Sequence, residues 1–275
     1  MADEPEFVDT HVHYWRPSAN DWYPGLRGGP LHRDVLPGAF PAPPRQVHVS
    51  AVTDLARALD EARWLDALRA ETGVPTAVIG TIDPAAPWAD TERLLFAQAE
   101  SPAFRGVRVF SGLDPAGPVA RSLFALLGER GWVHDLIARP ADVPALLPAL
   151  DAAPGTSFVL EHAGWPDGEA PEQFRAWRAA VAEVAARGNV DCKISGLGMA
   201  LQTTDATRLR PFVETCIELF GVDRCFFGSN FPVDGLAGTY EEIIGAYRAI
   251  TAGLSAADRA KLWSGNARRR YGLEA

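Results

Sequence analysis

The chain has 275 residues, of which 47% are hydrophobic, and this is enough for one large core; a single α/β barrel commonly needs about 250 residues. Its formal net charge of −9, without any basic stripe, argues against nucleic acid as a partner. No apolar run approaches the roughly 20 residues that cross a bilayer, and the acidic start MADEPEF does not resemble a signal peptide. Three cysteines without CxxC spacing suit a reducing compartment, so we expect a cytoplasmic protein with no membrane partner.

Short β-branched or aromatic runs alternate along the chain with stretches rich in Ala, Leu, Arg and Glu. Strands are predicted at 7–13, 46–51, 75–82, 105–110, 131–137, 156–162, 190–195 and 224–230. Helices are predicted at 54–72, 89–99, 118–129, 140–152, 171–187, 205–220 and 239–251. A C-terminal helical pair follows, opened by the capping-box signal of Ser255 and Asp258. Eight strands, most of them followed by a helix, predict a single-domain (β/α)₈ TIM barrel over residues 1–275. The competing doubly wound sheet lacks its GxGxxG signature here.

Segment 16–45 interrupts this rhythm, because a stretch dense in Pro and Gly stands where the first helix should be. In a barrel it would lie over the catalytic mouth as a lid, and Trp22 and Tyr23 would then cover a substrate. The alternative is a surface loop whose aromatic side chains only pack against the core.

Two of the six histidines, His11 and His13, stand one residue apart at the end of the first predicted strand. Because alternate residues of a strand share a face, Asp9, His11 and His13 point to the same side. The carboxyl ends of barrel strands carry the active site, so both imidazoles should project into its mouth. There they can bind a metal ion, polarise a carbonyl group or fill polar space.

Polar side chains also end other predicted strands, a pattern that core packing does not explain. Strand four aims Arg108 inward, and strand five offers either His134 or Asp135, between which alternation does not decide. The remaining ones are His162 after strand six, Asn230 at the edge of strand eight and Asp234 in the loop beyond.

Several motifs occur in one order over nearly the whole chain: DTHVHYW, GTIDP, RGVRVF, HDLIARPADVPALL, FVLEHAGWP, VDCKISGLGM, FFGSNFPVD and GNARRRYGL. Together they resemble the amidohydrolase superfamily, and in particular its lactonase-like branch of fuconolactone, rhamnonolactone and pyrone-dicarboxylate lactonases. The resemblance implies that His11, His13 and His162 form the floor of the site.

The chain departs from this family pattern at strand eight, where members usually carry an aspartate that binds metal or activates water. Here the position is Asn230, whose amide cannot take a proton. Asp234, four residues on, is the predicted replacement base, and Asp135 is the other candidate. Asn230 would then hydrogen-bond the water or the substrate.

The metal expectation follows from the same departure. Strand four lacks the lysine that bridges two ions in binuclear members, and the standard zinc set of His11, His13, His162 and a carboxylate is incomplete. We therefore expect no tightly bound metal, with one divalent ion such as zinc on those three histidines as the alternative.

Four further residues invite a structural and a functional interpretation each. Arg108 could hold a substrate carboxylate, or form an ion pair with Asp135. Lys193 could supply a compact ammonium in a confined site, or form one half of a buried structural pair, and we do not count it among the catalytic residues. Asp9 could orient a histidine, or have a purely structural role at the start of the strand. Glu161 is expected to face the helices, opposite to His162.

The leading hypothesis is a hydrolase that opens a small lactone or related cyclic ester, with the histidine cluster polarising the carbonyl group and a general base activating water. A metal-assisted decarboxylase or hydratase of the same superfamily is the first alternative. A binding protein with a degenerate site is the second. Neither the substrate nor the oligomeric state can be predicted from the sequence.

Overall fold

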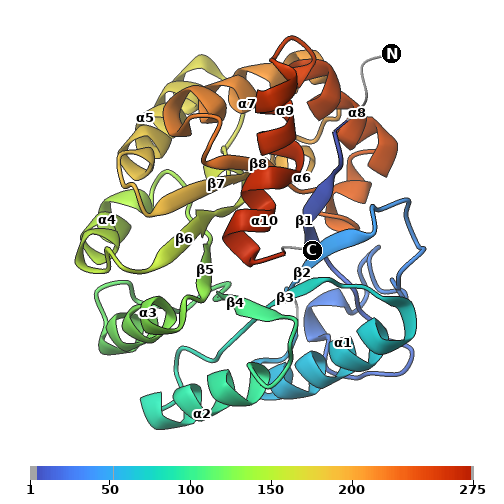
Figure 1. The fold of residues 1–275 in the computed structure, drawn as a ribbon, viewed down its shortest axis with the longest axis vertical. Coiled ribbons are helices and arrows are strands. Elements are labelled where there is room, and N and C mark those ends of the chain that lie inside the picture. The colour runs from blue at the N-terminus through green and yellow to red at the C-terminus, as the bar shows by residue number, and fades with distance from the viewer. Residues whose placement is uncertain (1–4, 52, 274–275) are drawn as a thin grey trace.

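The computed structural model describes residues 5–51 and 53–273 and contains one sheet of eight parallel strands in sequential order (Figure 1). The strands are β1 (Val8–Val12), β2 (Arg45–Val49), β3 (Ala77–Gly80), β4 (Phe104–Arg108), β5 (Val133–Leu136), β6 (Ser157–Leu160), β7 (Val190–Ile194) and β8 (Cys225–Phe227). The predicted single-domain (β/α)₈ barrel is thereby confirmed. Each strand ends earlier than predicted, so His13, His162 and Asn230 lie just beyond their strands, whereas the other polar residues, His11, Arg108 and Asp135, lie within them.

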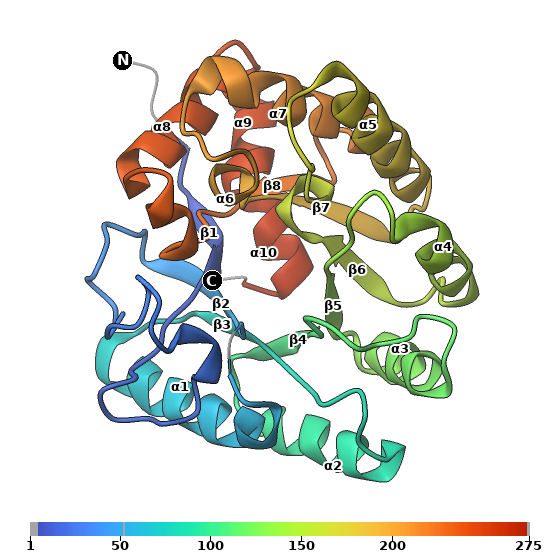
Figure 2. The same cartoon turned by 180° about the vertical axis from the view of Figure 1, so that it is seen from behind.

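Most of the helices surround the strands on their outer side, and α6 and α10 lie at the two ends of the barrel (Figure 1, Figure 2). They are α1 (Ala58–Thr72), α2 (Trp88–Gln98), α3 (Pro118–Arg130), α4 (Val143–Ala152), α5 (Pro171–Ala185), α6 (Leu197–Leu201), α7 (Ala206–Phe220), α8 (Tyr240–Thr251), α9 (Ala256–Ala260) and α10 (Asn266–Tyr271), with a π-helical turn at Lys261–Gly265 between the last two. Short 3₁₀ turns lie at Pro24–Leu26, Leu55–Arg57, Glu161–Gly164 and Val233–Leu236. Along the described chain, no helix has the length and apolarity that crossing a membrane requires.

Ser255 is the N-cap of α9, because its Oγ accepts the Asp258 N–H at 3.1 Å, and the same hydroxyl donates to the Asp258 carboxylate at 2.8 Å. This is half of the predicted capping box, whose second bond would run to the Ser255 backbone N–H. Between β1 and β2 the chain forms only the turn Pro24–Leu26 and no α-helix, as the composition of segment 16–45 indicated. Helix α6 was not predicted, because five residues are too few to show a helical period.

The barrel closes between β1 and the residues that follow β8. The Asn230 N–H donates to the His11 carbonyl at 2.8 Å, and the His13 N–H donates to the Phe231 carbonyl at 2.8 Å. Buried Asp9 adds to this seam, because its carboxylate accepts the Ser229 N–H at 2.8 Å and the Tyr240 hydroxyl at 3.0 Å. Asp9 therefore has the structural role and orients no imidazole ring.

The two ends of the barrel differ in what covers them. Helix α10 lies across the ring of strands in Figure 1, and Ala267 and Tyr271 pack there against the first residues of the strands, such as Val8 and Val133. Figure 2 shows the opposite end, where α6 and the segment after β1 lie. One end is thus plugged by apolar packing, and the carboxyl ends of the strands remain for a site.

Gly106 in β4 provides a test of the barrel geometry. A Cβ atom here would lie 1.9 Å from the Val133 carbonyl oxygen of β5, and the backbone has φ +156°. We expect Gly106→Ala to lower the free energy of unfolding by about 3 kcal/mol or more, since backbone cannot yield as a side chain does. Chemical denaturation measures this. Gly155→Ala is the control, since a Cβ there has open space; equal stability of the two variants would contradict the geometry.

Candidate active site

A cavity of about 260 Å³ opens at the carboxyl ends of the strands. Its polar lining consists of four side chains that the sequence analysis singled out, namely His13, Arg108, His162 and Asn230. The rest of the lining is Trp15, Gly25, Leu26, Gly29, Pro30, Leu31, Ala51, Phe110, Trp165, Met199, Val233 and Leu236. Four strands far apart in the sequence thus bring their polar ends into one small volume.

The two histidines of β1 face each other through their Nε2 atoms, which are 3.2 Å apart. His13 places its Nδ1 atom 2.7 Å from the Val49 carbonyl oxygen. A carbonyl can only accept, so Nδ1 carries the proton and a neutral His13 ring keeps its lone pair on Nε2. His11 lies behind it, with Nδ1 3.4 Å from the Glu161 carboxylate. Alternation along the strand predicted this convergence.

Glu161 does not face the helices as predicted, because the chain leaves the strand conformation at this point. Strand β6 ends at Leu160, and the following turn holds His162 at φ +54° and Ala163 at φ +53°. The indole N–H of Trp177 donates to the Ala163 carbonyl at 2.7 Å and stabilises this left-handed turn. The turn breaks strand alternation, so Glu161 and His162 both point into the barrel.

The Glu161 carboxylate is the centre of a buried charge cluster. Arg108 Nη1 lies 3.0 Å from it and Lys193 Nζ 3.6 Å, and all three side chains are at most 2% exposed. Burial opposes ionisation, but these two cations outweigh it and lower the pKa of Glu161 to about 2. Glu161 is therefore a carboxylate throughout the physiological range.

Lys193 also pairs with Asp135, which in turn accepts a hydrogen bond from the Tyr271 hydroxyl at 3.0 Å. Asp135 thus faces the barrel interior, while His134 packs outward between the rings of Phe124 and Phe158. Asp135 does not line the cavity, because Lys193 lies between it and Glu161. The expectation of a buried pair at Lys193 is confirmed, and Asp135 is its partner.

Arg108 lines the cavity, but its charge is matched by Glu161 and not by Asp135. Its Nε and Nη2 atoms donate to the Ser50 carbonyl. Two of the five guanidinium N–H bonds remain for other partners. Arg108 therefore offers hydrogen-bond donors to the cavity, but its positive charge is already balanced by Glu161. This does not favour the predicted binding of a substrate carboxylate by Arg108.

Asn230 connects the histidines to Asp234. Its Oδ1 atom lies 3.3 Å from His13 Nε2, and its Nδ2 atom donates to Asp234 at 2.7 Å. The same carboxylate accepts the backbone N–H groups of Gly198 and Met199. Asp234 therefore returns toward strand eight, as expected, but it lies fully buried behind Asn230 and does not line the cavity. Burial raises the pKa of Asp234 to about 7, although these three donors oppose the rise.

All three histidines are neutral at neutral pH. Burial, together with Arg108, lowers the pKa of His13 to about 4. Burial also lowers the pKa of His162 to about 3, where Glu161 opposes the shift and Arg108 adds to it. Burial and Lys193 place the pKa of His11 well below its usual range. The cluster therefore offers unprotonated imidazoles.

The segment after β1 supplies cavity residues other than those predicted. Tyr23 is only 2% exposed and packs in the core with Leu26, while Trp22 lies against the Arg57 guanidinium. Neither ring lines the cavity, so the prediction that they cover a substrate lacks support in this structure. Trp15, which stacks on the His13 ring at 5.9 Å, lines the cavity and was missed. Its position two residues after His13 was the available signal.

A divalent metal ion would find donors of the right type here. His11, Glu161 and His162 each offer one atom, and these atoms lie within 4.8 Å of one another. Two imidazoles and a carboxylate suit zinc. This set differs from the predicted one, because Glu161 stands in place of His13. Its charge balance is unfavourable, since an added ion would sit beside Arg108 and Lys193, which already neutralise Glu161.

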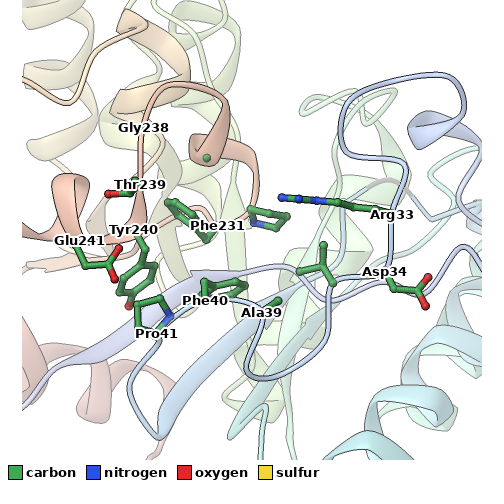
Figure 3. A pocket seen from close by; sticks show the side chains of 13 residues that line it. Arg33, Asp34, Ala39, Phe40, Pro41, Phe231, Gly238, Thr239, Tyr240 and Glu241 are labelled. Atoms are coloured by element: carbon green, nitrogen blue, oxygen red, sulfur yellow. The ribbon is translucent and has the colours of Figure 1, made fainter.

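A second cavity, of about 370 Å³, lies between segment 33–41 and the loop that leads into α8 (Figure 3). The rings of Phe40, Phe231 and Tyr240 gather in it with centroids 5.2–5.7 Å apart. None of the histidines lines it. This cavity therefore lacks the histidine cluster, and the smaller cavity at the strand ends, which His13 and His162 line, is the candidate site.

The comparison with known families agrees with this placement. A family model described as Amidohydrolase matches residues 8–273. The chain therefore belongs to the amidohydrolase family, a family of hydrolases.

Individual relatives cover nearly the whole chain. An L-fucono-1,5-lactonase from Burkholderia multivorans is 33% identical over 97% of this chain and 96% of its own length. The uncharacterized protein y4mH from Sinorhizobium fredii is 31% identical over 96% and 97%. A solved amidohydrolase from Burkholderia multivorans superposes with a TM-score of 0.83 at 30% identity, covering 98% of this chain and 100% of that one. It has been crystallised with HEPES and with zinc.

The charge cluster predicts a specific pattern of stability. Lys193→Met leaves two buried carboxylates without their shared cation, and we expect a loss of about 3–5 kcal/mol in the free energy of unfolding. Adding Asp135→Leu to that variant removes one orphaned charge and should recover part of the loss. Urea denaturation of both single variants and the double variant measures the coupling. Simple additivity of the two single losses would contradict the pairing.

Proposed function

We propose that the protein is a hydrolase that opens a small lactone by attack of an activated water molecule in the cavity at the strand ends. The observation that carries this proposal is the pair of neutral imidazoles of His13 and His162 beside a guanidinium with free N–H bonds, all lining one cavity, while His11 lies behind His13. Relatives named L-fucono-1,5-lactonase support the reaction class.

His13 is the base in this proposal. It lines the cavity, it is unprotonated at neutral pH, and its lone pair lies on Nε2. When it accepts a proton from water, the Asn230 carbonyl oxygen 3.3 Å away can accept the new N–H. His11 lies next in line, with the Glu161 carboxylate behind it, and this negative charge stabilises the protonated pair.

The sequence pointed instead to Asp234 or Asp135 as the base. Three N–H donors already occupy the Asp234 carboxylate, and Asn230 stands between it and the cavity. Asp135 is held by Lys193 and Tyr271. We therefore give Asp234 a positioning role, since it holds the Asn230 amide with its oxygen toward His13.

The remaining steps follow from the side chains around the cavity. The free N–H bonds of Arg108, with His162 beside them, stabilise the negative charge that develops on the lactone carbonyl oxygen. The water oxygen forms a bond to the carbonyl carbon while its proton passes to His13. The bond from that carbon to the ring oxygen then breaks, and His13 returns the proton to the leaving alkoxide. The product is a hydroxy acid.

A divalent ion held by His11, Glu161 and His162 would supply Lewis-acid polarisation of the carbonyl group. The proposal does not use it, because Arg108 and Lys193 already balance the charge of Glu161.

The pH dependence of lactone hydrolysis tests which residue is the base. A base works only when unprotonated, so the rate falls as pH drops through its pKa. With His13 as the base, kcat/KM should drop by no more than about tenfold around pH 7, where the positioning residue Asp234 is protonated, and should fall steeply only around pH 4. With Asp234 as the base, the steep fall would already begin around pH 7.

Substitutions provide the matching test. We expect His13→Gln to lower kcat by about 10²–10⁴, because an amide cannot take a proton. Thermal stability is measured beside it, because His13 is only 2% exposed. Asp234→Asn should lower kcat by about tenfold or less, as expected of a positioning residue. The steep fall of the rate near pH 4, which we call the acid limb, should remain in this variant. A loss at Asp234 as large as that at His13, with the acid limb abolished, would assign the base to Asp234.

Metal dependence is a separate prediction. After dialysis against 1,10-phenanthroline, we expect kcat/KM to stay within about twofold, because no step needs the Lewis acid. Elemental analysis of protein purified without added metal should give less than one divalent ion per chain. Loss of activity on chelation, with recovery on adding zinc, would contradict the metal-free mechanism.

A further inference from the structure

We infer that the lactone this site accepts is uncharged and carries apolar, rather than hydroxyl, substituents. This inference rests on the proposed lactone hydrolysis and concerns the part of the substrate that does not react. It departs from the hydroxylated sugar lactone that two relatives are named for.

The cavity wall is the first argument. The charged, imidazole and amide side chains of the lining all belong to the group that faces the reacting carbonyl, namely His13, Arg108, His162 and Asn230. The remaining side chains of the lining carry no carboxylate, hydroxyl or amide, and the indole N–H groups of Trp15 and Trp165 are their hydrogen-bond donors. They include Leu26, Leu31, Met199 and Val233. A sugar lactone would bring several hydroxyls against this wall, and a buried hydroxyl without a hydrogen-bond partner is unfavourable.

The rim of the cavity is the second argument. Among the described residues, four large hydrophobic side chains are exposed, and the two most exposed are Phe110 at 55% and Leu236 at 53%. Both line this cavity. Exposed apolar groups that gather at one site mark a place where an apolar ligand binds. A substituent that extends outward from the lactone ring would cover both side chains.

Charge is the third argument. Arg108 supplies the one permanent cation among the described residues of the lining, and its guanidinium is matched by Glu161 at 3.0 Å. The lining therefore offers no unmatched positive charge to an acidic substituent. The volume of about 260 Å³ limits the ligand to one ring, or two fused rings, with a short chain.

The test compares lactones that share a six-membered ring: dihydrocoumarin and δ-octalactone against L-fucono-1,5-lactone, D-glucono-1,5-lactone and 2-pyrone-4,6-dicarboxylate. A pH-indicator assay on the purified full chain gives kcat/KM for each. We expect the apolar pair to be hydrolysed with kcat/KM at least about 100-fold higher, as expected when unpaired buried polar groups penalise the wrong ligand. A hydroxylated or acidic lactone that equals or exceeds the apolar pair would overturn the inference.

Binding of stable analogues separates this inference from the proposed reaction. Chroman lacks the carbonyl group of dihydrocoumarin, and 1,5-anhydro-L-fucitol lacks that of the sugar lactone. If no lactone is hydrolysed but calorimetry finds that chroman binds more tightly, the proposed hydrolysis fails and the apolar site stands. If the anhydro sugar binds as tightly, or chroman does not bind, the inference is wrong.

A matched pair of variants locates the effect at the rim. Leu236 ends one 3₁₀ turn and Leu55 begins another, and both are exposed, but only Leu236 lines the cavity. We expect Leu236→Ser to raise KM for dihydrocoumarin about tenfold with kcat nearly unchanged, the effect of one lost apolar contact. Leu55→Ser should leave both constants unchanged. An unchanged KM in a folded Leu236→Ser protein would overturn the role of the rim.

Discussion

The arrangement of the site depends on one carboxylate, that of Glu161, which is held away from water at the centre of the barrel. An isolated buried charge is strongly unfavourable, so it persists only with close partners of opposite charge. Those partners come from separate strands: Arg108 from β4 at 3.0 Å and Lys193 from β7 at 3.6 Å. With Asp135 as the second acid, the cluster has two positive and two negative groups. This balance fixes three strands and the turn after β6 relative to one another.

Burial and the same cluster together keep the histidines unprotonated. Burial is the largest cause that places the pKa values of His11, His13 and His162 below the ordinary value, and the buried cations of the cluster add to it. A neutral imidazole can accept a proton during the reaction, and Glu161 then compensates the new charge through His11. The site is therefore set up to acquire positive charge only transiently.

The sequence was sufficient for the barrel and for the convergence of His11, His13, His162 and Asn230, because strand alternation and the position of polar residues at strand ends are local patterns. The sequence did not predict that Glu161 points into the barrel. The left-handed turn at His162 and Ala163 depends on tertiary contacts, and the alternation of polar and apolar residues along the strand does not reveal it. Segment 16–45 illustrates the same limit. Its composition indicated the missing helix, but irregular backbone decides which aromatic rings reach the cavity.

Asn230 shows how a chain can lose a family carboxylate without losing the geometry around it. Asp234 lies 2.7 Å from the Asn230 amide nitrogen, so an aspartate at 230 would place two carboxylates in contact in a buried site. Such a pair shares one proton and cannot ionise fully. The amide avoids this conflict, because it donates to Asp234 on one side and presents its oxygen to His13 on the other. Asn230 and Asp234 thus form one unit that orients a hydrogen-bond acceptor toward His13, the base in our proposal, whose ring is kept neutral by burial and by Arg108.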